Sequence, residues 1–131
     1  MSDENLRILL AEDNPSNAEL IRYIVQRLGH CLEVVSDGQM ALEHCLHQEY
    51  DIVLMDLQMP VMDGLEATRR IRASSDYNRD QLGIVALSAA NITEYQPNGS
   101  IPGIDAYISK PFQIAEIEKS IQKVTQARQR L

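Results

Sequence analysis

The sequence predicts an α/β fold, in which helices cover both faces of a parallel β-sheet. Short apolar runs alternate along the chain with longer stretches in which apolar residues recur every three or four positions, and no linker or internal repeat interrupts them. Strands separated by a helix pair in parallel, because each helix is the crossover connection between them. The 131 residues suit one domain, and we expect a single domain over residues 1–131 with its core at about 6–128.

Composition excludes several classes of function. Hydrophobic residues make up 44% of the chain and charged residues 24%, which is typical of a soluble globular protein. There are 12 Lys and Arg against 19 Asp and Glu, a net charge of −7, and such a surface repels nucleic-acid phosphates. No apolar run approaches the roughly 18 residues that span a bilayer, and the N-terminus lacks the core of a signal peptide. We therefore expect a cytoplasmic protein that binds neither nucleic acid nor membrane directly.

The first predicted strand is the apolar run from Leu6 to Ala11. Asn14 followed by Pro15 is typical of a helix start, because Asn caps free backbone N–H groups and Pro fits the first helical turn. Gly29 is expected to end this helix. Its apolar face consists of Leu20, Ile21, Ile24, Val25 and Leu28.

Two further strands flank a second helix. The second strand is predicted at Cys31 to Val35, a turn at Asp37-Gly38, and the apolar part of the helix at Met40 to Leu46. Ile52 to Met55 is the most hydrophobic four-residue run in the chain, so we place this third strand at the centre of the sheet.

A loop containing Pro and Asp-Gly, from Leu57 to Gly64, precedes a third helix that we expect to begin near Leu65. The fourth strand is predicted at Gly83 to Ser88, and a short fifth strand at Ala106 to Ile108. The closing helix carries an apolar stripe that consists of Ile114, Ile117, Ile121 and Val124.

Polar residues gather where the predicted strands end. They are Glu12 and Asp13 after the first strand, Asp56 after the third, Ser88 at the end of the fourth and Lys110 after the fifth. Open parallel sheets bind ligands outside the carboxyl ends of their strands, so we expect these side chains to form one site. Alone, each acid could be a helix cap, the serine a turn residue and the lysine a solvated side chain. Their joint occurrence at four strand ends favours a site.

The charges of these residues indicate a metal-dependent chemistry. Three crowded carboxylates repel one another unless a cation neutralises them. Mg²⁺ prefers oxygen ligands and keeps coordination positions for substrate oxygens, whereas zinc would call for convergent His or Cys. One carboxylate can then act as a nucleophile toward phosphorus, while Lys110 and the Ser88 hydroxyl neutralise the phosphoryl oxygens.

Four motifs follow one another along the chain, and they are Leu9-Leu10-Ala11-Glu12-Asp13-Asn14, Asp51 to Asp56 continuing through Pro60 to Asp63-Gly64, Ala86-Leu87-Ser88-Ala89, and Tyr107-Ile108-Ser109-Lys110-Pro111-Phe112. Together they resemble the receiver domain of two-component response regulators over nearly the whole chain. The resemblance implies the flavodoxin-like (βα)5 fold, a doubly wound five-stranded parallel sheet in the order 2-1-3-4-5.

The resemblance also implies the ligands of a magnesium ion. Asp56 is the expected phosphoacceptor and a metal ligand. Asp13 is expected to bind Mg²⁺ directly, Glu12 mainly through water, and Gln58 through its backbone carbonyl.

Further roles follow from the same resemblance. Ser88 and Lys110 are expected to hold the phosphoryl oxygens, and on phosphorylation Ser88 is drawn toward the phosphoryl group while Tyr107 turns inward as a switch. Gln58 and Ala90 are expected to tune the lifetime of the phosphorylated state, because they flank the path of water.

Two structural expectations concern the segments near the fourth and fifth strands. The peptide bond between Lys110 and Pro111 is typically cis in the family. In the region of the fourth helix, residues 91–103, two prolines and two glycines fall within seven residues, so this helix should be irregular or shortened.

The implied function is that of a phosphoacceptor. A histidine kinase or a histidine phosphotransfer protein would donate the phosphoryl group to Asp56, and the altered conformation would control a downstream protein or an attached domain. The chain would catalyse only its own phosphorylation and dephosphorylation, and so would not be an enzyme. The run from Met59 to Thr68 resembles receivers of hybrid histidine kinases.

Two alternatives remain open. One is a metal-dependent phosphatase of the haloacid-dehalogenase kind, although Gln58 stands where that family has a second Asp. The other is a receiver-like interaction module that works without phosphorylation.

Overall fold

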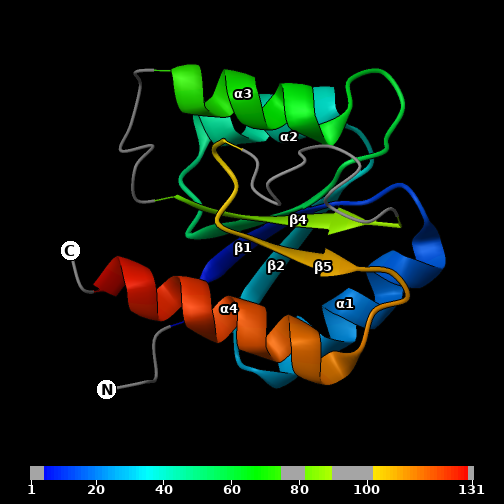
Figure 1. Ribbon diagram of the computed structural model, residues 1–131, viewed down its shortest axis with the longest axis vertical. Coiled ribbons are helices and arrows are strands. Elements are labelled where there is room, and N and C mark those ends of the chain that lie inside the picture. The colour runs from blue at the N-terminus through cyan, green and yellow to red at the C-terminus, as the bar shows by residue number, and fades with distance from the viewer. Residues whose placement is uncertain (1–4, 75–81, 90–101, 130–131) are drawn as a thin grey trace.

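The computed structural model describes residues 5–74, 82–89 and 102–129, and there it contains one parallel five-stranded sheet between two layers of helices. The strands are β1 (Arg7–Ala11), β2 (Cys31–Val35), β3 (Ile52–Asp56), β4 (Gly83–Ser88) and β5 (Ala106–Ser109). The helices are α1 (Pro15–Arg27), α2 (Gly38–His47), α3 (Gly64–Ala73) and α4 (Ile114–Gln129). The strand order β2-β1-β3-β4-β5 confirms the flavodoxin-like prediction. Figure 1 shows α2 and α3 on one face of the sheet, and α1 and α4 on the other.

The sheet separates two hydrophobic cores, because successive side chains of a strand point to opposite faces. In β1, Ile8 and Leu10 belong to the core beneath α1 and α4, while Leu9 and Ala11 belong to the core beneath α2 and α3. The predicted central strand β3 is buried along its whole length. Both of its faces are therefore covered, which explains why it is a continuous apolar run up to its last residue, Asp56.

Aspartate or asparagine caps begin three helices. Asn14, Asp37 and Asp63 each accept a hydrogen bond from a backbone N–H in the first turn of the helix that follows. The predicted turn at Asp37-Gly38 is therefore a cap followed by the first residue of α2, and α3 begins at Gly64, one residue before the predicted start.

The strand bounds differ from the prediction by one residue at several ends. β1 begins at Arg7 rather than Leu6, because the Leu6 N–H donates to a histidine ring instead of a strand. β3 continues to Asp56, and β5 continues to Ser109.

The predicted irregular fourth helix lies almost wholly outside the described residues. In the described part of the chain, no helix is both long and apolar enough to cross a membrane.

A polar network lies at the amino ends of the strands, opposite the predicted site. The Arg7 N–H donates to Asp51 Oδ2 at 2.8 Å, and the Arg7 guanidinium lies 5.3 Å from the centre of the Tyr50 ring. The Leu6 N–H donates to His30 Nδ1 at 3.2 Å, which requires an unprotonated Nδ1. Burial lowers the pKa of His30, and this effect outweighs the opposing charge of Asp51.

Stability should therefore fall when the solution is acidified below about pH 6.5, the ordinary pKa of histidine. The unfolded chain takes up a proton on His30 in this range, while the folded chain resists it, so protonation favours unfolding. His30→Gln removes the titrating group and keeps an acceptor for the Leu6 N–H. Urea unfolding between pH 7.5 and 5.5 should show a smaller loss of stability in this variant than in the parent. Equal losses of stability in the variant and the parent would contradict the assignment of the acid sensitivity to His30.

Candidate functional site

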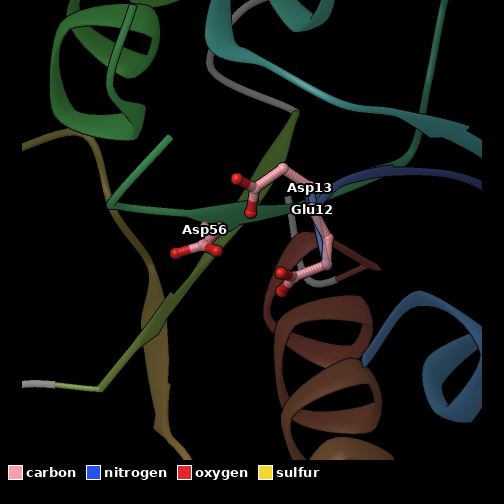
Figure 2. Close-up of side chains that lie close together, drawn as sticks. All are labelled: Glu12, Asp13 and Asp56. Carbon is pink, nitrogen blue, oxygen red and sulfur yellow. The ribbon is translucent and has the colours of Figure 1, made fainter. Parts of the chain in front are cut away.

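The five predicted site residues at the strand ends all lie at one edge of the sheet. Glu12 and Asp13 follow β1, Asp56 ends β3, Ser88 ends β4, and Lys110 follows β5. The three carboxylates are close neighbours, since one oxygen from each lies within 4.8 Å of the others (Figure 2). Asp56 is 2% exposed and Glu12 is also buried, whereas Asp13 faces solvent.

Lys110 is the cation that binds the buried carboxylates. Its Nζ donates to Asp56 Oδ2 at 3.0 Å and lies 3.6 Å from Glu12 Oε1. The other oxygen of Asp56, Oδ1, accepts a hydrogen bond of 3.1 Å from the Gln58 N–H. Two different donors thus fix the orientation of the Asp56 carboxylate.

The electrostatics of Glu12 and Lys110 follow from this arrangement. Burial raises the pKa of Glu12, and the negative charge of Asp56 raises it further. Burial alone would lower the pKa of Lys110, but the hydrogen bond and charge of Asp56 outweigh it and the pKa is raised. Lys110 is therefore charged at neutral pH, yet one ammonium does not balance three carboxylates.

The remaining negative charge fits a hard divalent cation. Glu12 Oε2 accepts a hydrogen bond from the Asn14 N–H, but Oε1 is buried and lacks a hydrogen-bond donor within the described part of the chain. A buried carboxylate oxygen without a donor costs free energy, and a metal ion or its bound water would satisfy it. All the atoms that this cluster offers as metal ligands are carboxylate oxygens, which suits Mg²⁺.

Replacing Glu12 by Gln is expected to raise the free energy of unfolding by about 1 kcal/mol at pH 7.5 in EDTA. A carboxyl group whose pKa is raised by folding destabilises the fold at any pH above its ordinary value of 4.5, because its ionised form is disfavoured there. Urea denaturation measures the difference, and the gain should disappear near pH 4. Glu19→Gln, on the exposed side of α1, is the matched control and should change little. A Glu12→Gln variant less stable than the parent would contradict this account.

The predicted switch residues lie on neighbouring strands. Ser88 is 3% exposed, and its carbonyl accepts a hydrogen bond of 2.8 Å from the Lys110 N–H. Tyr107 pairs with Ala86 across the β4–β5 ladder, and it is 44% exposed. Ala90 lies outside the described residues.

A pocket opens beside the carboxylates. It has a volume of about 390 Å³ and is lined by Asp13, Leu57, Gln58, Met59, Pro60, Asp63 and Leu65. The predicted metal ligands Asp13 and Gln58 thus share one opening to solvent.

The expected cis peptide bond between Lys110 and Pro111 is confirmed.

Two glycines near the site were not predicted to matter. A Cβ atom on Gly64 would lie 2.2 Å from the Asp56 carbonyl oxygen, and one on Gly38 would lie 2.1 Å from the Met62 carbonyl oxygen. The available signal was an Asp-Gly pair directly before each amphipathic helix, which we interpreted only as a turn or loop.

Comparison with known proteins identifies the class. The family model for the response regulator receiver domain matches residues 8–122, so the chain belongs to the response regulator receiver family of two-component systems. The chain is 33% identical over 126 residues to the sensor protein GacS of Pseudomonas syringae pv. syringae, covering 95% of this chain but only 14% of GacS. The chain therefore spans about a seventh of that relative.

Solved structures give the same result. The receiver domain of the sensor histidine kinase PA1611 from Pseudomonas aeruginosa PAO1, which has a magnesium ion coordinated in its active-site cleft, has 38% identity and a TM-score of 0.81 over 92% of this chain and 97% of that one. TrrA from Thermotoga maritima, in complex with Mg²⁺-BeF, has 28% identity and a TM-score of 0.79 over 91% and 98%. The phosphatase and the phosphorylation-independent module are not favoured.

Proposed function

We propose that the chain accepts a phosphoryl group on Asp56 from a phosphohistidine protein, in a Mg²⁺-dependent reaction, and changes conformation to control a partner. The observation that carries this proposal is the position of Asp56. Its carboxylate is buried at the end of a central strand, among two other acids and 3.0 Å from the Lys110 ammonium. A carboxylate in such surroundings is a nucleophile with a charge-neutralising partner already in place.

The carboxylates of Glu12, Asp13 and Asp56 and the backbone carbonyl of Gln58 would hold the magnesium ion. When bound, Mg²⁺ supplies positive charge that stabilises the phosphoryl oxygens during transfer. The buried Glu12 Oε1, which accepts no hydrogen bond within the described residues, supports this assignment, and so does the magnesium ion described for the PA1611 receiver.

The side chains of this chain perform the transfer itself. A carboxylate oxygen of Asp56 forms a bond to phosphorus, while the P–N bond to the donor histidine breaks and its electron pair returns to the ring nitrogen. Lys110 and Ser88 would bind the phosphoryl oxygens, since Lys110 already reaches Asp56 and Ser88 ends the neighbouring strand.

The conformational response would follow along β4 and β5. The Ser88 hydroxyl would move toward the phosphoryl group, and the half-exposed Tyr107 would turn inward. Gln58, together with Ala90, would tune the lifetime of the phosphorylated state by limiting the approach of water.

The partners proposed are a histidine kinase or a histidine phosphotransfer protein as donor, and a downstream protein or attached domain as target. The similarity of the chain to parts of a sensor protein and of a sensor histidine kinase supports these partners, and the receiver of a hybrid kinase is one such setting. The chain would act in the cytoplasm, and would catalyse only its own phosphorylation and dephosphorylation.

Intact-mass measurement tests the proposal. Incubation with a small acyl phosphate and MgCl₂ should add one phosphoryl group, and EDTA should prevent the addition. Transfer from a purified phosphorylated histidine phosphotransfer protein should give the same adduct. A chain that gains no mass under either condition, or that turns over a generic phosphomonoester, would refute the proposal.

A further inference from the structure

The segment 57–63, between β3 and α3, is tied to the sheet at its beginning. The Leu57 N–H donates to the Leu87 carbonyl at 2.9 Å, and the Gly64 N–H donates to the Leu57 carbonyl at 3.1 Å. Farther along the segment, Val61 is 82% exposed and has a positive φ of 68°, which is unfavourable for a β-branched residue. Burial of the Val61 side chain therefore does not hold this part of the segment, although Met59 and Met62 on either side of it pack partly against the core beneath α2 and α3.

The contact at the far end of the segment comes from α2. The Gly38 N–H donates to the Met62 carbonyl at 3.0 Å. Gly38 is the first residue of α2, so this N–H has no acceptor within the helix. A Cβ atom at position 38 would lie 2.1 Å from the Met62 oxygen and 3.1 Å from the Asp63 oxygen, so a side chain could not be added without moving the segment.

The position of this segment matters because it carries Gln58. The Gln58 N–H holds Asp56 Oδ1 at 3.1 Å, and Gln58 lines the same pocket as Asp13. The segment is pinned at Leu57, so a shift at Met62 must be taken up by the residues between them.

We propose that Gly38 is a positioning residue, which lets the N-terminus of α2 hold the 57–63 segment in the shape that presents the Gln58 carbonyl to the magnesium site. This inference rests on the proposed function only for the identity of the metal. It assigns a role in the site to α2, a helix that contributes no side chain to the carboxylate cluster.

The test compares Mg²⁺ affinity with stability in Gly38→Ala. An NMR titration with MgCl₂ alone, without phosphodonor, should give a dissociation constant about tenfold higher than that of the parent, the usual scale for a residue that orients metal ligands. The control is Gly29→Ala, because Gly29 has a positive φ of 90°, which strains any added side chain, but has no neighbour within 4 Å of an added Cβ. This control should lose stability yet bind Mg²⁺ like the parent.

A purely structural role predicts a different result. In that case Gly38→Ala would have a lower Tm but an unchanged dissociation constant, and the proposal would be overturned. A parent chain that does not bind Mg²⁺ would overturn the proposed function as well. If the parent chain binds Mg²⁺ but is not phosphorylated, the proposed function is overturned, whereas a higher dissociation constant in Gly38→Ala still supports the positioning role of Gly38.

A measurement on the parent chain covers the case in which Gly38→Ala does not fold. If the Gly38–Met62 contact favours Mg²⁺ binding, then Mg²⁺ must stabilise the contact by the same free energy. Hydrogen exchange of the Gly38 amide should therefore slow about tenfold at saturating MgCl₂. Exchange at an unchanged rate would refute the coupling.

Discussion

Replacing Asp56 by Asn is expected to abolish phosphorylation of the chain. The amide keeps nearly the same shape, and its oxygen can still accept a hydrogen bond from the Gln58 N–H or from Lys110. It is, however, too weak a nucleophile to attack phosphorus. Intact-mass measurement after incubation with an acyl phosphate and MgCl₂ should show no adduct under conditions that label the parent fully.

Asp51→Asn is the matched control for this experiment. Asp51 lies just before the opposite end of β3, where its Oδ2 accepts a hydrogen bond from the Arg7 N–H. The variant removes the same charge, but at the edge of the sheet away from the carboxylate cluster, and should be phosphorylated like the parent. A phosphoryl adduct on Asp56→Asn would mean that another residue is the acceptor.

Gly64→Ala is expected to lower the free energy of unfolding by about 3 kcal/mol. The added Cβ would lie 2.2 Å from the Asp56 carbonyl oxygen and 2.9 Å from Leu57 Cα and Met55 Cγ. These atoms belong to the buried end of β3 and to the buried residue that follows it, so they cannot move away as an exposed loop can. The better helix propensity of alanine offsets only about 0.5–1 kcal/mol of this loss. Urea denaturation at pH 7.5 measures the difference.

Gly29→Ala again provides the comparison, since it introduces a strained φ but no steric clash. Gly29→Ala should lower the free energy of unfolding by about 1 kcal/mol, clearly less than Gly64→Ala. Equal losses of stability in the two variants would contradict this prediction, because the close approach of Gly64 to Asp56 should cost more than the strained φ at Gly29.

The element order and the parallel sheet could be predicted because their signals are local. β3 is buried on both faces and is therefore apolar from Ile52 to Met55, while α1 shows a buried face, an Asn cap and a glycine just after its end. The exact ends of strands were harder to predict. Leu6 is apolar like its neighbours, yet its N–H bonds to the ring of His30, which is 24 residues away in the sequence.

The location of the candidate site was predictable for a similar reason. In a parallel sheet the residues after each strand meet at one edge, and the acids and Lys110 were recognised there. The glycine contacts were not predicted, because the close approach of Gly38 to Met62, which leaves no room for a Cβ at position 38, depends on how two distant backbones pack. Hydrophobic periodicity contains no information about such an approach.

The separation of the two ends of the sheet has a consequence for combined variants. β3 spans five residues, so the network of Arg7, His30 and Asp51 at one end lies about 16 Å from the carboxylates at the other. Groups this far apart, with no shared partners, usually contribute independently to stability. The free-energy changes of His30→Gln and Glu12→Gln should therefore add. Each end of the fold could then change during evolution without compensating substitutions at the other.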